Sequence, residues 1–321
     1  MGKEVTSDST ITKTIKTKAR ELGFSSIGVA RTVSLETEGV RLQQWLSRGY
    51  HGTMEWMQKN FEKRVDPRQV LPNARSVVSL ALNYYTPVEH SENSETGKIS
   101  RYAWGDDYHI VMTSRIQMLV DCIKLERPEV NARFYVDTGP VLDKAWAVRA
   151  GVGWLGKHTN VITKEYGSWV FLGEIILDLE LEYDEPMADF CGTCTACIEA
   201  CPTDAIVGPY VLDSTKCISY LTIELKGPIP DKMKPELNGW VYGCDICQDV
   251  CPWNKFQQPT NEGAFLPRGE NVEPRLEDLQ SISAEEFTRR FKKSPIKRTK
   301  REGIVRNAKA VREGRSGGSA I

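Results

Sequence analysis

The chain has 321 residues, of which 40% are hydrophobic, and its formal net charge is −1. This length allows two or three domains, and the apolar content is enough to give each of them a core. No segment reaches the roughly 18 apolar residues that a membrane-spanning helix requires, because the best candidate, 169–177, is short and contains Glu174. The first ten residues are polar and do not resemble a signal peptide. These features predict a soluble, cytoplasmic protein without a membrane partner.

The segment 11–188 alternates between helical and strand-like patterns, which favours an α/β domain. The patterns predict helices over 11–22, 35–46, 106–125 and after Pro140, strands over 26–30, 76–84 and 132–136, and a hairpin over 160–180 that turns near Gly167. Cys122 stands alone in the long helix, where we expect it to pack in the core. We place the boundaries of this first domain at residues 1–188.

Asp137 follows the predicted strand 132–136 and precedes Pro140, which fits the first position of a helix. Side chains at strand ends often take part in chemistry. An aspartate ahead of a helix is also a common cap or turn former, so the residues alone leave both interpretations open. If Asp137 is a general acid, burial beside a cofactor is expected to raise its pKa.

A glycine-rich loop over 151–157 matches the dinucleotide-binding pattern and most of the phosphate-loop pattern. Both motifs need a preceding strand and a following helix, whereas this loop follows a helix and leads into a strand. We therefore exclude nucleotide binding. The glycines could instead let the backbone approach another cofactor, with polar contacts from Lys157, His158 and Asn160, or they could form a plain turn.

Eight of the nine cysteines lie within 191–251. The first four have the C-x2-C-x2-C-x3-C-P spacing of bacterial ferredoxins, in which the fourth cysteine binds the other of two 4Fe-4S clusters. The second group lacks one cysteine, and Cys217 can complete it. We therefore assign one cluster to Cys191, Cys194, Cys197 and Cys251, and its neighbour to Cys201, Cys217, Cys244 and Cys247.

Zinc and disulfides are the alternatives to these clusters. Zinc sites usually present two separated C-x2-C pairs, and disulfide frameworks belong to small secreted domains. Neither fits a run of three evenly spaced cysteines in a chain of this length. The sequence thus predicts a ferredoxin-like electron-transfer domain over 189–260.

The segment 261–321 is polar and basic. Ser283 and Glu286 form a capping box that predicts a helix to Phe291, and a second helix is expected over 302–312. The residues from Gly314 onward suggest a mobile tail. A cluster of cations predicts contact with a phosphate backbone, although such clusters are often only solvated surfaces: Arg289, Arg290, Lys292, Lys293, Lys297, Arg298, Lys300 and Arg301.

Several blocks, together with the cysteine array and in the same order, resemble the epoxyqueuosine reductase family. They are 64–68, 100–105, 137–146, 151–160, 167–174 and 217–222. The resemblance implies a cobalamin enzyme that performs the last step of queuosine biosynthesis, removing the epoxide oxygen of epoxyqueuosine at the wobble position of tRNA. It also implies an N-terminal cobalamin domain related to reductive dehalogenases, two 4Fe-4S clusters and C-terminal HEAT-like helical repeats.

The same resemblance assigns roles to individual residues. Asp137 matches the family's proton donor. The residues nominated around the corrin are Asn60, Arg64, Ser100, Tyr102, Asp137, Lys157, His158, Asn160, Ser168, Ser219 and Thr222. Some relatives carry cysteine at the position of Ser100, which leaves a thiol role there open. The implied partners are the anticodon region of tRNA and a low-potential electron donor, and we expect a monomer.

The helical repeats are expected to be truncated, because the chain ends soon after 305–308 begins what resembles the first of them. Solenoid repeats need neighbours, so we expect this remnant to be loosely packed. Two rival functions remain: a reductive-dehalogenase-like enzyme that acts on small organohalides, and a non-catalytic ferredoxin-type electron carrier with a nucleic-acid-binding arm.

Overall fold

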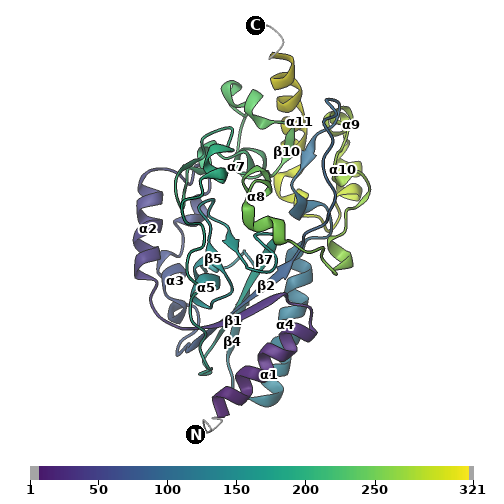
Figure 1. Cartoon of the computed structure of the whole chain (residues 1–321). Coiled ribbons are helices and arrows are strands. Elements are labelled where there is room, and N and C mark those ends of the chain that lie inside the picture. The colour runs from purple at the N-terminus through teal and green to yellow at the C-terminus, as the bar shows by residue number, and fades with distance from the viewer. Residues whose placement is uncertain (1–6, 318–321) are drawn as a thin grey trace.

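A four-stranded sheet forms the centre of the first half of the molecule (Figure 1), in a computed structural model that describes residues 7–317. The strand order is β1-β2-β7-β4, and every neighbouring pair is antiparallel. The four strands are β1 (Ser26–Arg31), β2 (Ser76–Asn83), β7 (Val170–Leu177) and β4 (Ala132–Tyr135). The predicted alternation of helices and strands is therefore present, but it produces an antiparallel sheet.

Helices cover both faces of this sheet, so its central strand β2 is buried along its whole length. Val78, Leu80 and Leu82 face the core formed with α1 (Ser7–Glu21) and α4 (Tyr108–Glu126), which lie side by side in Figure 1. Val77 and Ala81 face the opposite core, which includes α5 (Asp143–Arg149). The side chains of a strand alternate between faces, so a continuous apolar run is required here. The helices α2 (Glu36–Ser47) and α3 (Phe61–Val65) lie at the edge of this second core.

Three local predictions in this half need correction. The segment 160–180 is not one hairpin, because β6 (Val161–Ile162) pairs with β5 (Trp154–Leu155), while β7 pairs with β2 and β4. Only a single bridge, Thr163 to Gly167, remains of the predicted pairing. Pro140 does not begin a helix, since α5 starts at Asp143. Cys122 is half-buried rather than fully packed in the core.

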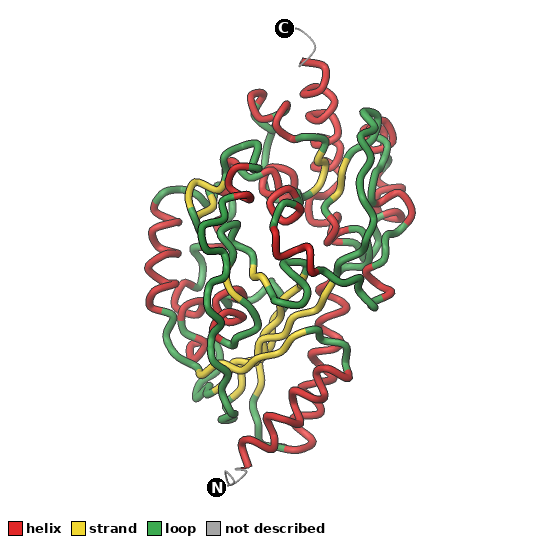
Figure 2. Tube along the Cα trace, in the orientation of Figure 1, coloured by secondary structure: helices red, strands yellow, loops and turns green. Residues whose placement is uncertain are grey.

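The cysteine-bearing segment consists mainly of loops with short helices and strands (Figure 2). These are α6 (Ala196–Glu199), β8 (Ile206–Gly208), β9 (Val211–Leu212), α7 (Ile218–Ile223), β10 (Trp240–Tyr242) and α8 (Ile246–Asp249). The strand β10 pairs in parallel with β3 (Lys98–Ile99). Ile99, Ala103 and Trp104 therefore pack in a third core, formed with buried residues between 218 and 311, rather than beside the central sheet. We call it the C-terminal core. The domain boundaries at 188 and 260 stay predictions.

The C-terminal helices are α9 (Leu276–Ser281), α10 (Ala284–Arg290) and α11 (Lys300–Gly317). Ser283 caps α10 by accepting a hydrogen bond from the Glu286 N–H, as the capping box predicted. Ile304, Ala308 and Val311 of α11 are buried in the C-terminal core.

The expectation of a loosely packed remnant is therefore wrong. The prediction of a mobile tail is also wrong for residues 314–317, which are helical. Residues 318–321 lie outside the described residues. No helix within residues 7–317 is long and apolar enough to cross a membrane.

Candidate active site and cluster ligands

All eight clustered cysteines are free thiols. Burial, together with Cys251, Cys191 and Cys194, raises the pKa of Cys197 to about 11. Burial also raises the pKa of Cys247, followed by the effects of Cys217, Asp245, Cys197 and Cys201. Because such electrostatic effects require proximity, thiols of the two predicted groups lie near one another, and their division into two ligand sets stays a prediction.

Burial, and then Cys247 and Cys217, also raise the pKa of Cys244, the remaining member of the second group. No group of three or more His, Cys, Asp or Glu side chains within residues 7–317 is arranged to hold a single metal ion. The sets are hereafter called the outer set (Cys191, Cys194, Cys197, Cys251) and the inner set (Cys201, Cys217, Cys244, Cys247).

A cavity of about 410 Å³ lies between the inner set and the end of the central sheet. All four cysteines of the inner set line this cavity, and none of the outer set does. Asp137, which follows β4, also lines it, together with the aromatic rings of Tyr84, Tyr102 and Phe171. The inner set and Asp137 therefore share one cavity. We call this space the first cavity.

Asp137 is held in place by two neighbours from the start of α4. Its Oδ2 atom accepts a hydrogen bond of 2.8 Å from the Tyr108 hydroxyl and lies 3.7 Å from Nε2 of His109. The Nδ1 atom of His109 is 2.7 Å from Oδ1 of Asp107, which caps α4. The backbone of Asp137 has a φ of 58°, in the left-handed region. This turn at the end of β4 directs the carboxylate into the cavity, where 65% of the side chain is accessible even though protein surrounds it.

The electrostatics of this pair differ from the sequence-based expectation. The nearby His109 lowers the pKa of Asp137, although its Nε2 at 3.7 Å is too distant for a hydrogen bond, and this effect outweighs the opposing effect of burial. Burial also opposes protonation of His109, but the carboxylates of Asp107 and Asp137 raise its pKa to about 9. At neutral pH the pair therefore holds its proton on the imidazole. Burial acts on the Asp137 pKa in the predicted direction but the net pKa is lowered, and the effect of a bound cofactor stays a prediction.

Three further ionisable residues lie near Asp137, namely Asp143 and Lys144 at the start of α5 and Glu174 of β7. Burial raises the pKa of Asp143 to about 6 and raises the pKa of the fully buried Glu174 well above its ordinary value. Lys144 donates a 3.0 Å hydrogen bond to Oδ1 of Asn160, and the surrounding protein lowers its pKa. The sequence analysis missed His109, Tyr108, Asp143 and Lys144 as site residues. Lys144 and Asp143 lie within the block 137–146, which could have indicated them.

His158 presents an unused hydrogen-bonding atom in the first cavity. Its Nδ1 accepts a 3.2 Å hydrogen bond from the Asn160 N–H, whereas its Nε2 is buried without a partner among the described residues. Burial, and then Lys144, lower its pKa to about 4, so the imidazole is neutral at pH 7. With Nδ1 accepting, the hydrogen resides on Nε2. A buried N–H without an acceptor fits a site whose bound group supplies that acceptor.

The structure brings seven of the nominated corrin contacts to the first cavity, namely Ser100, Tyr102, Asp137, His158, Asn160, Ser168 and Ser219. The hydroxyl of Ser100 donates to Asp245, and that of Ser168 donates to Gln248, so both also anchor the segment that carries the inner set.

Four nominated residues do not line the first cavity. The Lys157 ammonium donates to the carbonyls of Gly192 and Cys194, and the Arg64 guanidinium donates to the carbonyl of Trp56. The Thr222 hydroxyl donates to the Ile218 carbonyl. Asn60 is exposed just before α3. Their contacts with a corrin stay predictions.

Comparisons with known proteins agree with this arrangement. The model of a 4Fe-4S double cluster binding domain matches residues 190–254, and the model described as epoxyqueuosine reductase QueG, DUF1730, matches residues 64–138. An epoxyqueuosine reductase of Leadbetterella byssophila is 50% identical over 301 residues, which are 94% of this chain and 98% of that protein.

This relative covers nearly the whole chain at high identity. The chain belongs to the epoxyqueuosine reductase family. It is therefore an oxidoreductase, and the double cluster domain gives it two 4Fe-4S clusters. The epoxyqueuosine reductase of Pseudomonas aeruginosa is 42% identical over 92% of this chain and 83% of that protein.

Two solved epoxyqueuosine reductases share the fold. One, bound to an epoxyqueuosine-modified tRNA-Tyr stem loop, has a TM-score of 0.89 and 35% identity, covering 94% of this chain and 80% of that chain. The other, from Bacillus subtilis, has a TM-score of 0.88 and 34% identity, covering 94% of this chain and 81% of that chain. In that structure a loop with a catalytic aspartate has swung out of the active site. The predicted HEAT-like, truncated character of 261–321 stays a prediction.

Proposed function

We propose that this epoxyqueuosine reductase removes the epoxide oxygen of epoxyqueuosine at the wobble position of tRNA and leaves the alkene of queuosine. The two carbon–oxygen bonds break, a carbon–carbon double bond forms, and two electrons and two protons convert the oxygen to water. The observation that carries this proposal is the first cavity, which is lined both by the four thiols of the inner set and by Asp137. Electrons and protons can therefore reach a substrate bound in the same cavity.

The residues of the first cavity fit the cofactors of this chemistry. The inner and outer sets would each hold one 4Fe-4S cluster. Cobalamin would occupy the first cavity, where the Nε2–H of His158 and the amide of Asn160 offer hydrogen bonds to it. When bound, cobalamin supplies a strongly reducing cobalt, and the protein supplies position and protons. The cavity-lining aromatic rings would exclude water from the reacting carbons.

Asp137 is the proton donor in this proposal, and His109 stores the proton that Asp137 delivers. The imidazolium lies 3.7 Å from the carboxylate, which itself projects into the cavity. As the epoxide opens, Asp137 accepts a proton from His109 and passes it to the oxygen. Asp107, on the far side of the ring, fixes the orientation of the imidazole. The loop in Bacillus subtilis that moves its catalytic aspartate supports a functional role for the strained turn at Asp137.

The organisation of the whole chain follows from these roles. Residues 1–188 would form the cobalamin domain, 189–260 the electron-transfer domain, and 261–321 a basic helical segment that contacts tRNA. The cytoplasm, where tRNA is processed, is the expected compartment. A low-potential donor supplies the electrons, and a monomer is sufficient because one chain carries both cysteine sets and Asp137.

The decisive experiment supplies anaerobically reconstituted enzyme, loaded with iron, sulfide and cobalamin, with epoxyqueuosine-containing tRNA and a chemical reductant. Nucleoside analysis should show conversion to queuosine. A parallel reaction with a small aryl halide tests the dehalogenase alternative. Halide release without queuosine formation would contradict the proposal, and so would cluster oxidation and reduction without either product, as expected of a pure electron carrier.

A further inference from the structure

Glu174 places a carboxyl group in the middle of the central sheet. It lies on β7, between β2 and β4, and its side chain is inaccessible to solvent. Leu172 and Ile176, two residues away on either side, pack in the core that includes α5, so the alternation of a strand directs Glu174 to the same face. A glutamate is almost never fully buried unless it has a partner. The partner of Glu174 therefore has to come from this face of the sheet.

The two carboxyl oxygens of Glu174 have different surroundings. Oε1 accepts a hydrogen bond of 3.3 Å from the Ser79 hydroxyl of β2, whereas Oε2 is buried and accepts none from the residues 7–317. An oxygen that carries a hydrogen needs an acceptor instead of a donor. Asp143, the first residue of α5, is this acceptor. Burial, and then the charge of Asp143 and a hydrogen bond to it, raise the pKa of Glu174 well above its ordinary value.

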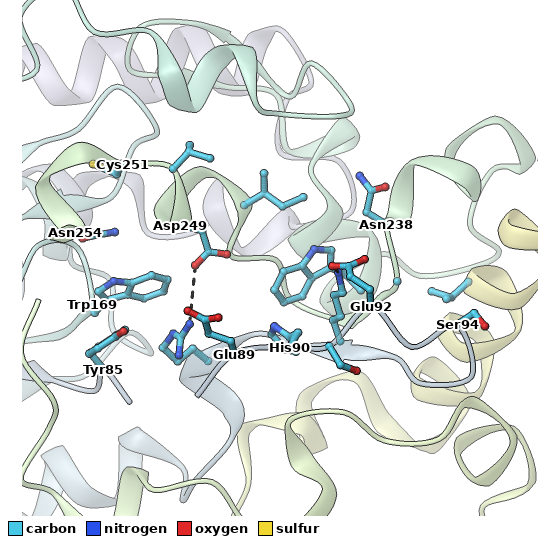
Figure 3. A pocket seen from close by; sticks show the side chains of 18 of the residues that line it. Tyr85, Glu89, His90, Glu92, Ser94, Trp169, Asn238, Asp249, Cys251 and Asn254 are labelled. Carbon is cyan, nitrogen blue, oxygen red and sulfur yellow. Dashed lines mark hydrogen bonds and ion pairs between the residues drawn. The ribbon is translucent and has the colours of Figure 1, made fainter. Parts of the chain in front are cut away.

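This pair of acids lacks the cation that accompanies other acids of the molecule. A second cavity, of about 1050 Å³, provides the comparison, since its Asp249 lies 4.0 Å from the guanidinium of Arg101, as the dashed line in Figure 3 shows. No ion pair among residues 7–317 involves Asp143 or Glu174. Two neighbouring buried carboxyls cannot both ionise without a large cost, so a shared proton takes the place of the cation.

The charged groups around the pair leave one proton on it at neutral pH. Burial raises the pKa of Asp143 to about 6, and Asp137 acts in the same direction, whereas Lys144 opposes it. Asp137 also raises the pKa of Glu174. The two carboxyls titrate as one unit. At pH 7 Asp143 is therefore a carboxylate, and Glu174 is a carboxylic acid that donates to it.

Asp143 connects this stored proton to the first cavity, which it lines together with Asp137. The proposed reaction delivers two protons to one oxygen. Asp137 delivers the first, which comes from His109, and neither residue then retains a proton to transfer. The opened epoxide still carries a hydroxyl group, which leaves far more readily as water than as hydroxide. A second acid at the same cavity is therefore required.

We propose that Glu174 and Asp143 supply the second proton of the reaction, with Asp143 as the catalytic residue and Glu174 acting through it. The inference rests on the proposed function, which it deepens. The O–H bond of Glu174 breaks as that of Asp143 forms, and Asp143 then protonates the departing hydroxyl group, which leaves as water. The two electrons of the reaction come through the clusters, and none moves within the pair. Water that enters after product release returns a proton to the two carboxylates.

The test compares variants of the pair with the unaltered holoenzyme. Glu174→Gln keeps the size of the side chain and a donor to Asp143 but has no proton to transfer. The single-turnover rate constant with epoxyqueuosine-containing tRNA should fall by about 10²-fold, at the lower end of the contribution of a positioned acid, while the Kd for this tRNA stays the same. Asp143→Asn, on the cavity wall, should have a similar effect. The double variant should be no slower than the slower single variant, because both substitutions interrupt one proton path.

Two further measurements distinguish a proton store from a structural role. The infrared spectrum of the substrate-free holoenzyme at neutral pH should contain the C=O stretch of a buried protonated carboxyl group, and Glu174→Gln should lose this band. The ratio of the single-turnover rates in H2O and D2O should be larger in Glu174→Gln, because delivery of the second proton then limits the rate. A displaced substrate would slow the reaction equally in both solvents.

Ser79→Ala is the matched control, because it removes the hydrogen bond to Glu174 but leaves its proton. This variant should keep the infrared band and most of the rate, and iron and cobalamin content should be the same in every variant. Unchanged rates in both Glu174→Gln and Asp143→Asn would overturn the inference and leave Lys144, which also lines the first cavity, as the second acid. A carboxyl band that persists in Glu174→Gln, or an isotope ratio that does not rise, would overturn it as well.

The infrared band requires no substrate and therefore separates this inference from the proposed function. If the unaltered enzyme converts epoxyqueuosine to queuosine and both variants do so at the same rate, only the inference about the pair fails. If the unaltered enzyme forms no queuosine although the band is lost in Glu174→Gln, the stored proton is confirmed and the proposed function fails.

Discussion

Asp137 occupies a left-handed backbone position, with a φ of 58°, which asparagine adopts more readily than most residues. Asp137→Asn therefore keeps the turn and the hydrogen bond from Tyr108 while removing the acid. We expect turnover of epoxyqueuosine-containing tRNA to fall by about 10²- to 10⁴-fold, the usual contribution of a positioned acid. Iron content and cobalamin absorption, measured on the same samples, should not change. Retention of more than a small fraction of the activity would contradict the assignment of Asp137 as proton donor.

The pH profile tests whether His109 stores the proton. The pKa of His109 is raised to about 9, so the pair with Asp137 keeps its proton at neutral pH and loses it as the pH rises through about 9. Turnover should decline over that range. In His109→Gln only the Asp137 carboxyl can hold the proton, and carboxyls ionise near pH 4. The alkaline decline should then shift to lower pH by at least about two units.

Tyr108→Phe is the matched control, because it removes the hydrogen bond to Asp137 without removing a group that titrates near neutrality. It should lower the rate while leaving the alkaline decline in place. Other charged groups near the carboxylate, Lys144 and Asp143, are present in both variants and cannot cause the difference. An unchanged pH profile in His109→Gln would show that the imidazole only supports the structure.

At the scale of elements, Cys217 lies immediately before α7 and is the predicted fourth ligand of the inner set. We expect Cys217→Ser to lose the inner cluster and to keep the outer one, because the outer set contains none of the same ligands. Iron and sulfide content should fall by half, and the paramagnetic resonance spectrum of the reduced protein should contain one cluster signal. Cys122→Ser, which alters the cysteine outside both sets, is the control. Full iron content in Cys217→Ser would exclude this ligand assignment.

The helix α11 is attached to the inner-set segment by hydrogen bonds from Arg306 and from the buried amide of Asn307. Asn307 is inaccessible to solvent and donates to the carbonyls of Thr222 and Val241 at 2.6 and 2.8 Å. Asn307→Ala leaves both carbonyls buried without these donors, so we expect a loss of about 1–3 kcal/mol in the free energy of unfolding. Urea denaturation followed by circular dichroism measures it. The exposed Lys309→Ala on the same helix should change stability far less, and equal effects of the two substitutions would contradict this account.

The sequence correctly predicted the elements whose formation depends on residues close together in the chain. The strand β2, the helix α4 and the cap at Ser283 follow from apolar runs, periodicity and one side-chain hydrogen bond. The failures involve distant contacts. Thr163 and Gly167 bridge a tight turn, but the strands on either side pair with other partners, β6 with β5 and β7 with β2 and β4. A Cβ at Gly314 would lie 2.3 Å from the Lys234 carbonyl oxygen, so the end of α11 packs against a segment distant in the sequence.

The functional site, like the fold, was predictable from the sequence only where residues close together in the chain determine it. Cysteine spacing indicated both ligand sets, because ligands of one cluster recur at fixed intervals in the chain. The pairing of Asp137 with Tyr108 joins positions 29 residues apart, and nothing in either local sequence indicates it. The lowered pKa of Asp137 follows from this pairing with α4 and could not be inferred from the strand end alone.

At the scale of the whole molecule, seven of the eight cations of the basic segment 289–301 are of two kinds, and the eighth, Arg301, donates to the Ile282 carbonyl. Arg289, Arg290 and Arg298 lie near the carboxylates of Glu286, Glu270 and Glu224. Lys292, Lys293, Lys297 and Lys300 are exposed, and no ion pair involves them within residues 7–317. The lysines are therefore the cations available to tRNA phosphates, whereas the arginines mainly stabilise the surrounding surface.

The salt dependence of tRNA binding distinguishes these two kinds. Each phosphate contact releases condensed counterions, so the slope of log K against log salt concentration changes by about 0.7–0.9 per contact. Lys293→Gln/Lys297→Gln should reduce the slope by about 1.4–1.8 if both lysines contact phosphates. The reduction should be the same for tRNA with and without epoxyqueuosine, because phosphate contacts do not distinguish bases. Lys124→Gln should leave the slope unaltered. If the double variant also leaves it unaltered, tRNA binds through another surface.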